Sequence, residues 1–192
     1  MAASTRSLAL DACGVQPPEM GALPNSVTVV RRESPADIER IYSVHAASFP
    51  TAAEGALVDA LRAAGQLSIS LVAVEYDRVI GHVAFSPITV DGAPLGLGLA
   101  PVAVQPGCRQ RGVAARLIRE GLELCRGAAG LVVVLGHPRY YSRFGFEPAR
   151  LFALRDEYEG GDAFQALELV RGAVPPEGGL VRYSPEFAAL GV

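Results

Sequence analysis

This chain of 192 residues has little of several features that mark particular classes of protein. Its formal net charge is −3, so it lacks the basic surface that recruits nucleic acid. It has no apolar run of about 18 residues, the length that a membrane-spanning helix needs. Its start also lacks the charged and apolar segments of a signal peptide. We therefore expect neither nucleic acid nor a membrane as a partner.

Cysteine is scarce as well. The three cysteines, Cys13, Cys108 and Cys125, form neither an even set for disulfides nor a spacing typical of metal sites. This pattern indicates a reducing compartment, which we take to be the cytoplasm, and we expect no bound metal.

What the sequence does have is material for one sizeable core. Half of its residues are hydrophobic and 19% are charged, and its length suits a single domain with tails. Residues 1–26 are rich in Ala, Ser, Pro and Gly without a sustained period, which predicts a loosely ordered tail. We expect one domain over residues 27–187 and a short C-terminal end over residues 188–192.

Hydrophobic periodicity predicts an alternation of strands and helices. Capping boxes at Ser34–Asp37 and Thr51–Glu54 indicate the starts of two helices, and a third begins near Gly112. The predicted strands cover residues 26–32, 67–75, 79–90, 95–104, 131–135, 164–170 and 180–183, with one more from Phe146 and a short helix over residues 139–143. This order predicts a mixed α/β fold whose front half is antiparallel.

Alternation along residues 79–90 predicts which side chains share a face of that strand. One face is predicted to carry Val79, Gly81, Val83 and Phe85, and the other Ile80, His82, Ala84 and Ser86. A lone histidine on such a face is either a hydrogen-bonded core residue or a catalyst, and His82 is therefore a candidate for both roles.

The most informative stretch is a strand that feeds a basic turn and then a helix. The apolar run ends at Val104, and Arg109, Gln110, Arg111 and Gly112 precede the helical pattern. A helix start offers free N–H groups and the positive end of the helix dipole, which suit a phosphate. Neither G-x-x-x-x-G-K-[ST] nor a G-x-G-x-x-G after the strand is present, so the turn is not a P-loop or a dinucleotide fingerprint.

Two motifs resemble those of one enzyme family. Residues 109–114, read as R-x-x-G-x-A, resemble the pyrophosphate-binding signature of the GNAT acetyltransferases. Residues 140–146, YYSRFGF, resemble the Y-x-x-x-G-F segment that closes the GNAT fold, and the fuller string VLGHPRYYSRFGFEPA is similar to the YhbS-type branch of the family. Two motifs in the right order are more specific than either alone. The resemblance covers about residues 27–187.

This resemblance implies a fold, an activity and a co-substrate. The fold would be a central mixed sheet that splays apart beside its central strand, with helices on both faces. The activity would be direct transfer of an acetyl group from acetyl-CoA to an amine of a small molecule or peptide, without an acyl-enzyme. The resemblance implies a coenzyme site formed by Val102, Ala103, Val104, Arg109, Gln110, Arg111, Gly112, Val113 and Ala114.

The resemblance also implies catalytic roles. Tyr141 matches the family tyrosine that protonates the departing thiolate, with Tyr140 as its rival, and both rings could instead pack in the core. A backbone N–H at Val104 or a neighbour would face the thioester oxygen. The base is open between Glu54, which the Thr51 capping box also explains, His82, His137 and a water.

Two other functions and the acceptor stay open at this point. A degenerate domain could hold acetyl-CoA as a sensor or structural ligand, with a sealed acceptor groove. An acyltransferase for longer acyl groups would need a wide apolar cavity. Four acids are predicted around the acceptor pocket, or else as solvated surface charges: Glu54, Glu157, Glu159 and Asp162. We expect a monomer or a homodimer.

Overall fold

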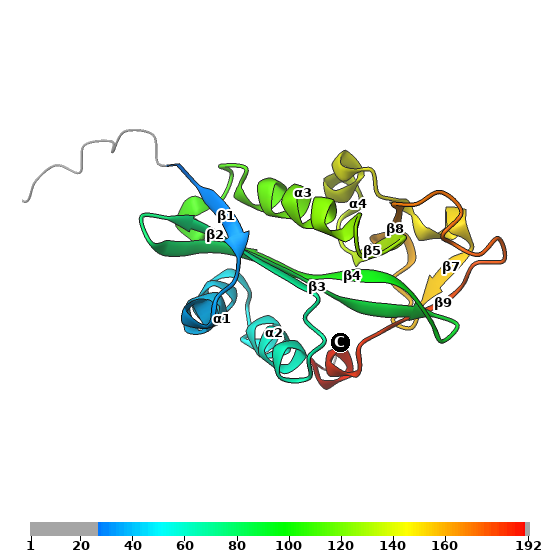
Figure 1. The fold of residues 1–192 in the computed structure, drawn as a ribbon, viewed down its shortest axis with the longest axis horizontal. Helices are drawn as coiled ribbons and strands as arrows, with labels where there is room; N and C mark the ends of the chain where they lie inside the picture. Colours follow the sequence, from blue (N-terminus) through cyan, green and yellow to red (C-terminus); the bar gives the residue numbers. More distant parts are fainter. Residues whose placement is uncertain (1–26, 191–192) are drawn as a thin grey trace, which may run out of the picture.

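The computed structural model of the protein describes residues 27–190 (Figure 1). The tail predicted over residues 1–26 lies outside the described residues, as do residues 191–192. Within residues 27–190, no helix is long and apolar enough to cross a membrane. In the same range, no three His, Cys, Asp or Glu side chains gather in a way that could hold a metal ion.

The centre of the fold is a nine-stranded mixed sheet. Its main path runs β1-β2-β3-β4-β5-β8-β6, and β9 pairs with both β3 and β7. Neighbouring strands are antiparallel except for the pairs β4–β5 and β7–β9. The strands are β1 (Val29–Arg32), β2 (Ile69–Glu75), β3 (Arg78–Val90), β4 (Ala93–Val104), β5 (Leu131–Leu135), β6 (Glu147–Pro148), β7 (Leu154–Asp156), β8 (Phe164–Glu168) and β9 (Gly179–Tyr183). The mixed α/β fold is thus confirmed, and β7 is a strand that the sequence pattern missed.

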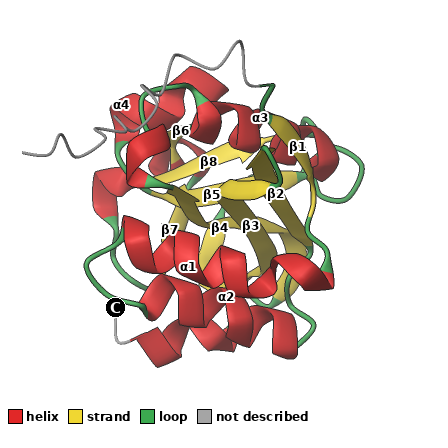
Figure 2. Cartoon of the chain, turned by 90° about the vertical axis from the view of Figure 1, so that its left-hand side faces the viewer, coloured by secondary structure: helices red, strands yellow, loops and turns green. Residues whose placement is uncertain are grey.

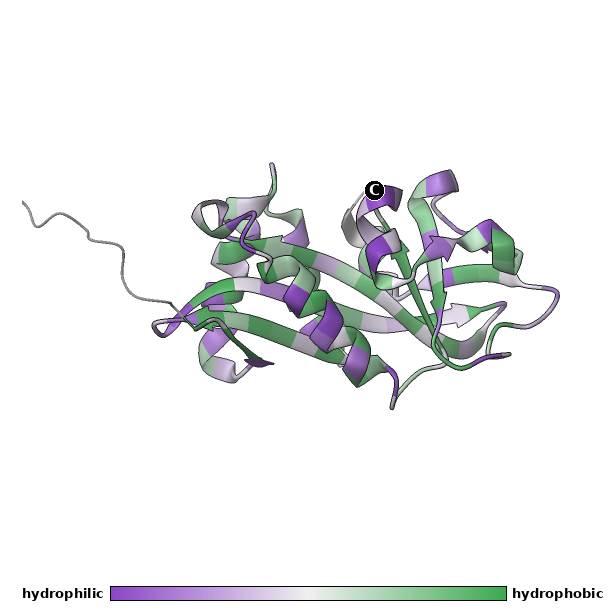
Figure 3. Cartoon of the chain, turned by 90° about the horizontal axis from the view of Figure 1, so that it is seen from above, coloured by the Kyte–Doolittle hydropathy of each residue, from purple (hydrophilic) through white to green (hydrophobic). Residues whose placement is uncertain are grey.

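Helices cover both faces of this sheet (Figures 1 and 2). The helices α1 (Ile38–Ser48) and α2 (Ala53–Ala63) pack on one face, α3 (Val113–Cys125) packs on the other, and the short α4 (Pro138–Tyr141) follows β5. Apolar residues dominate the strands between these layers (Figure 3). Burial of that apolar surface stabilises the sheet and holds the helices in place.

One of the two predicted capping boxes forms and the other does not. Ser34 donates its N–H (2.8 Å) and its hydroxyl (2.7 Å) to the Asp37 carboxylate, which confirms the first start. At the second, Thr51 only accepts the N–H of Ala53, and the N-cap is Ala52. The helix α2 begins one residue later than predicted, so Glu54 is not in the third helical position that a capping box requires. The prediction of a box there is wrong.

A bulge also changes the faces of β3. Ala73 pairs with Gly81 but the next residue, Val74, pairs with Val79, so Ile80 is an extra residue in β3. Val79 therefore packs with α1 and α2, and Ile80 packs with α3. The predicted alternation is wrong for these two residues and correct from Gly81, whose Cβ position faces α3, through Phe85.

The sheet splays between β4 and β5, as the family resemblance implied. The two strands pair only through Gly96, Leu97 and Gly98 of β4. Beyond that point, residues 99–104 pair with β3 alone, and a second bulge sits opposite β3 between Leu99 and Val102. Among the described strands none pairs with the other edge of residues 99–104. That edge is therefore open to a ligand.

Candidate active site

A cavity of about 550 Å³ lies between the open edge of β4 and the start of α3. It is lined by Ser48, Phe49, Val102, Ala103, Val104, Cys108, Arg109, Gln110, Gly112, Val113, Ala114, Ala115, Tyr140 and Arg143. We call it the first cavity. The structure thus brings together eight of the nine residues predicted for the coenzyme site, and the ninth, Arg111, is not among the lining residues.

The start of α3 gives this cavity its anion-binding character. Arg116 makes the first intrahelical bond, to the Gly112 carbonyl, so the N–H groups of Val113, Ala114 and Ala115 precede that bond. Gly112 has φ of +79°, which favours glycine, and a Cβ there would meet nothing within 4 Å. The N–H groups, the helix dipole and the open space beside Gly112 together suit a phosphate group.

Two arginines of the predicted site behave differently. Arg109 lines the first cavity, where its guanidinium donates to the carbonyls of Val104 (3.3 Å) and Ser48 (3.0 Å). Arg111 instead pairs with the carboxylate of Glu75 on β2. The sequence motif places both cations in the turn, but the structure brings only Arg109 to the cavity.

The open edge of β4 presents backbone groups to this cavity. Gln105 donates its N–H to the Ile80 carbonyl of β3 at 2.9 Å. Because backbone groups alternate in direction along a strand, the N–H groups of Val102 and Val104 point away from β3. Both residues line the first cavity, so these N–H groups are available to a bound molecule there.

A second cavity, of about 330 Å³, lies next to the first and shares Phe49 and Val102 with it. It is lined by Phe49, Glu54, Leu57, Leu99, Ala100, Pro101, Val102, Val134, Leu135, Tyr141, Tyr158, Tyr183 and Phe187. The splayed ends of β4 and β5 form one wall, and the segment after β9 forms another. Molecules bound in the two cavities would contact each other near Val102.

The two neighbouring tyrosines of α4 face different cavities. Tyr140 lines the first and Tyr141 the second, and their rings cross at 86°. Tyr141 is only 8% exposed, and its ring packs against Gly136, where a Cβ would lie 2.3 Å away. Burial, with a smaller effect of Tyr140, raises the pKa of Tyr141 to about 12. At neutral pH its hydroxyl therefore carries a proton that it can donate.

Glu54 is the acidic residue that reaches the second cavity. Its Oε2 atom is buried and has no hydrogen-bond partner among residues 27–190. The other three acids predicted around the acceptor are not among the residues that line this cavity. Glu157 accepts the N–H of Tyr183 and pairs with Arg182. Asp162 lies 3.9 Å from Arg150, and both of these side chains are largely exposed.

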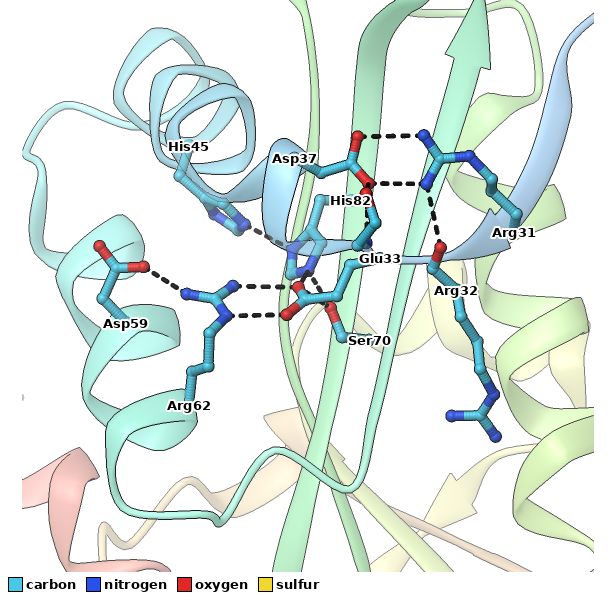
Figure 4. A network of polar contacts seen from close by, with 10 residues as sticks. Arg31, Arg32, Glu33, Asp37, His45, Asp59, Arg62, Ser70 and His82 are labelled. Atoms are coloured by element: carbon cyan, nitrogen blue, oxygen red, sulfur yellow. Dashed lines mark hydrogen bonds and ion pairs between the residues drawn. The ribbon is translucent and has the colours of Figure 1, made fainter.

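His82 lies in a buried polar network rather than in a cavity (Figure 4). Its ring forms hydrogen bonds with the His45 ring and the Ser70 hydroxyl, each at 2.8 Å. The Ser70 hydroxyl also donates to the Glu33 carboxylate, which accepts another hydrogen bond from Arg62. It is fully buried, and burial, His45 and Arg62 together lower the pKa of His82 well below its usual value. His82 lines neither of the two cavities, and neither does the exposed His137 at the start of α4.

Several lining residues were not found from the sequence. Ser48 ends α1 and Phe49 follows it, and Tyr158, Tyr183 and Phe187 lie in the C-terminal part of the chain. Apart from the neighbours Ser48 and Phe49, they share no spacing, because they come from different elements. Only the concentration of aromatic residues late in the chain gave any signal.

Comparison with known proteins agrees with this geometry. Residues 29–149 match the family described as an acetyltransferase (GNAT) domain. The chain is similar to the uncharacterized N-acetyltransferase YhbS of Escherichia coli K12, at 42% identity over 163 residues, which are 83% of this chain and 98% of YhbS.

Two solved structures are similar over most of the chain. The crystal structure of Escherichia coli YhbS in complex with CoA matches with a TM-score of 0.82 and 40% identity, over 88% of this chain and 96% of that chain. A GNAT acetyltransferase from Brucella melitensis in complex with acetyl-CoA matches with a TM-score of 0.71 and 39% identity, over 85% and 99%. The family match over more than half of the sequence, and relatives this similar over most of it, show that the chain belongs to the GNAT family of acetyltransferases.

Proposed function

We propose that the protein transfers the acetyl group of acetyl-CoA directly to an amine of a small molecule or peptide. The observation that carries this proposal is the meeting of two cavities at Val102, one beside the anion-binding start of α3 and one beside Tyr141. The similar proteins from Escherichia coli and Brucella melitensis, solved with CoA and acetyl-CoA, support the first cavity as the coenzyme site.

In this proposal the coenzyme follows the first cavity. Its pyrophosphate binds the N–H groups of Val113, Ala114 and Ala115 and the guanidinium of Arg109. Its pantetheine arm, which carries amide groups, runs along the open edge at Val102 and Val104 as an added strand would. The thioester then reaches the point where the two cavities join.

The reaction requires an electrophile, an acid and a base. The amine nitrogen attacks the thioester carbon, and the oxygen gains negative charge facing the Val104 N–H, a kind of contact worth about 3 kcal/mol. The C–N bond forms, the C–S bond breaks, and Tyr141 gives its proton to the departing thiolate. The nitrogen, now bonded to the acetyl carbon, loses its second proton, which restores the Tyr141 hydroxyl and leaves the neutral amide. Glu54 takes the proton that the ammonium must lose before attack.

The placement of the three candidate bases favours Glu54. Its carboxylate lines the cavity next to Tyr141, whereas His82 is enclosed in the network with His45 and Ser70. A fully enclosed histidine cannot meet a substrate directly. The open second cavity also favours an enzyme over a sensor, for which a sealed groove would be expected.

The remaining parts of the proposal rest on the sequence. We propose that residues 27–187 act as a single domain, that the enzyme works in the cytoplasm, and that it is a monomer or a homodimer. Its co-substrate is acetyl-CoA, and we propose no metal.

Calorimetry with acetyl-CoA tests the central claim. Acetyl-CoA should stabilise the protein by about 2.7 kcal/mol at 100 times its dissociation constant, and neither NAD nor ATP should do so. Acetyl transfer should then be followed by CoA release and by mass spectrometry over a set of amines and peptides. The chain contains no lysine, so acetylation of the enzyme on lysine cannot be mistaken for acetylation of the acceptor. Absence of both binding heat and a melting shift with acetyl-CoA would overturn the proposal.

A further inference from the structure

The second cavity has a wall of aromatic rings that come from distant parts of the chain. Phe49 follows α1, Tyr141 ends α4, and Tyr158, Tyr183 and Phe187 lie in the C-terminal part. The ring centroids of Tyr158 and Tyr183 are 5.7 Å apart, and those of Tyr183 and Phe187 are 5.2 Å apart. The faces of such rings carry negative charge density and attract a cation.

Two polar atoms in this wall have no partner. Oε2 of Glu54 and Oη of Tyr183 are buried, and neither makes a hydrogen bond within residues 27–190. A buried acceptor without a hydrogen-bond partner destabilises the protein, and it does so more when it is charged. A ligand that brings N–H groups to these atoms would remove that cost.

The distribution of charge around the cavity also favours some ligands over others. Of the residues that line it, Glu54 is the one acidic residue, and no arginine or histidine is among them. A ligand with one positive group would be neutralised by Glu54. A ligand that also carries a carboxylate or phosphate would leave that anion without a counter-ion in a largely apolar space.

We infer that the acceptor is a small primary monoamine with an apolar body and no anionic group. This inference rests on the proposed function. The ammonium lies between the Glu54 carboxylate and the tyrosine rings, and the apolar body packs on Leu57, Leu99 and Val134. A volume of about 330 Å³ is near the lower end for ligand cavities, which fits a small molecule. Transfer of the ammonium proton to Glu54 then leaves the neutral amine beside the thioester.

Matched pairs of acceptors test the absence of an anion. Phenethylamine should be compared with phenylalanine, and isoamylamine with leucine, because the members of each pair differ only by a carboxylate. Each amine should show a kcat/KM at least about tenfold above that of its amino acid, because the carboxylate would be buried without a partner. Equal values within the pairs, or acetylation of peptides alone, would overturn the inference.

A binding experiment without chemistry tests the cation itself. N,N-dimethylphenethylamine keeps the charge but gives no stable amide, and 2-phenylethanol is its neutral counterpart. Calorimetry on the CoA-saturated protein should show the amine binding at least about tenfold more tightly than the alcohol. Glu54→Gln should reduce this ratio to near one. Glu159→Gln, which removes the same charge from an exposed side chain next to Tyr158, should preserve it.

The outcomes separate the inference from the proposed function. If acetyl-CoA binds and the charged and neutral probes bind equally, the inference fails and the proposed function stands. If acetyl-CoA does not bind, the proposed function fails, and the same probe ratio measured on the free protein still decides whether the cavity prefers a cation. Loss of the ratio in Glu159→Gln as well would show a general surface effect and would overturn the assignment to Glu54.

Discussion

The two cavities that meet at Val102 are built in different ways. Most of the first cavity comes from one continuous stretch, residues 102–115, in which a strand edge, a turn and a helix start follow one another. The second cavity draws on seven separate parts of the chain, from Phe49 to Phe187. A single sequence motif can therefore indicate the first cavity, whereas the second cavity exists only after the sheet has formed.

The family match contains all of the first cavity but only part of the second. It covers residues 29–149, which contain the residues of the first cavity. Tyr158, Tyr183 and Phe187 of the second cavity lie beyond it. The family match therefore includes the whole first cavity, whereas the second cavity also needs residues from beyond it. The variants below test the different roles proposed for the two cavities, from the largest expected effect on acetyl transfer to the smallest.

Gly112→Glu should have the largest effect, because it places a carboxylate where the first cavity would hold a phosphate. Like charges in contact cost several kcal/mol, so the affinity for acetyl-CoA should fall at least about 100-fold by calorimetry. Gly65→Glu is the control, since Gly65 also has a positive φ, of +70°, with nothing within 4 Å of its Cβ position. If Gly112→Glu binds the coenzyme as well as the unchanged protein, the phosphate lies elsewhere.

Tyr141→Phe should impair the chemistry while sparing the coenzyme. A positioned general acid contributes about 10²–10⁴-fold, so turnover should fall at least about tenfold even if a water substitutes. Because the lost contact acts in the transition state, kcat and kcat/KM should fall together, and the acetyl-CoA affinity should stay the same. Tyr140→Phe, on the neighbouring ring, should have a mild effect. The reverse pattern would assign the acid to Tyr140.

The two arginines of the motif should differ in their contribution to coenzyme binding. Arg109→Gln removes a cation from the first cavity and should weaken acetyl-CoA binding about tenfold. Arg111→Gln should weaken it less than about threefold, because an exposed guanidinium paired with Glu75 contributes little to a distant anion. Titrations at two salt concentrations would measure both. A larger loss for Arg111→Gln would contradict the placement of its side chain.

The buried histidine pair should affect stability rather than transfer. Burial lowers the pKa of His45 to about 4, and that of His82 is also lowered. As the pH falls from 6.5 toward 4, the unfolded chain takes up protons that the native protein does not. The free energy of unfolding should therefore fall by up to about 1.4 kcal/mol per pH unit for each histidine, and it should be independent of this pair above pH 6.5.

Denaturant titrations at pH 7.5, 6.5 and 5.5 would measure this effect. Hydrogen bonding to Arg31 lowers the pKa of the Asp37 carboxyl. Protonation of Asp37 therefore changes the free energy of unfolding only below this pH range. His137→Gln, which removes an exposed histidine, should leave the profile unchanged. An unfolding free energy that is constant over these three pH values would contradict the buried, uncharged state of the pair.

Several expectations failed for reasons that single-sequence patterns do not contain. The capping box at Thr51 failed because α2 starts one residue later, which turns Glu54 from a helix cap into a cavity residue. The faces of Val79 and Ile80 were exchanged by a bulge opposite Val74. A bulge adds one residue to one strand of a pair, and nothing in an alternating sequence signals where that happens.

What the sequence by itself determined is the part of the molecule governed by short-range order. The end of β4, the turn, Gly112 and the amphipathic helix α3 follow one another along the chain. Their composition and spacing therefore indicate both the helix start and the anion site that we propose there. The order of strands and helices was likewise readable, because periodicity is a local property.

Only the tertiary structure decided which of those residues face one another. Tyr141 packs against Gly136 and faces the second cavity. Arg111 pairs with the carboxylate of Glu75 on β2 and does not line the first cavity, and His82 is enclosed with His45 beneath the helices. Each of these outcomes depends on contacts between segments far apart in the chain. Their geometry is set by the burial of apolar surface in the whole fold, and no local pattern records it.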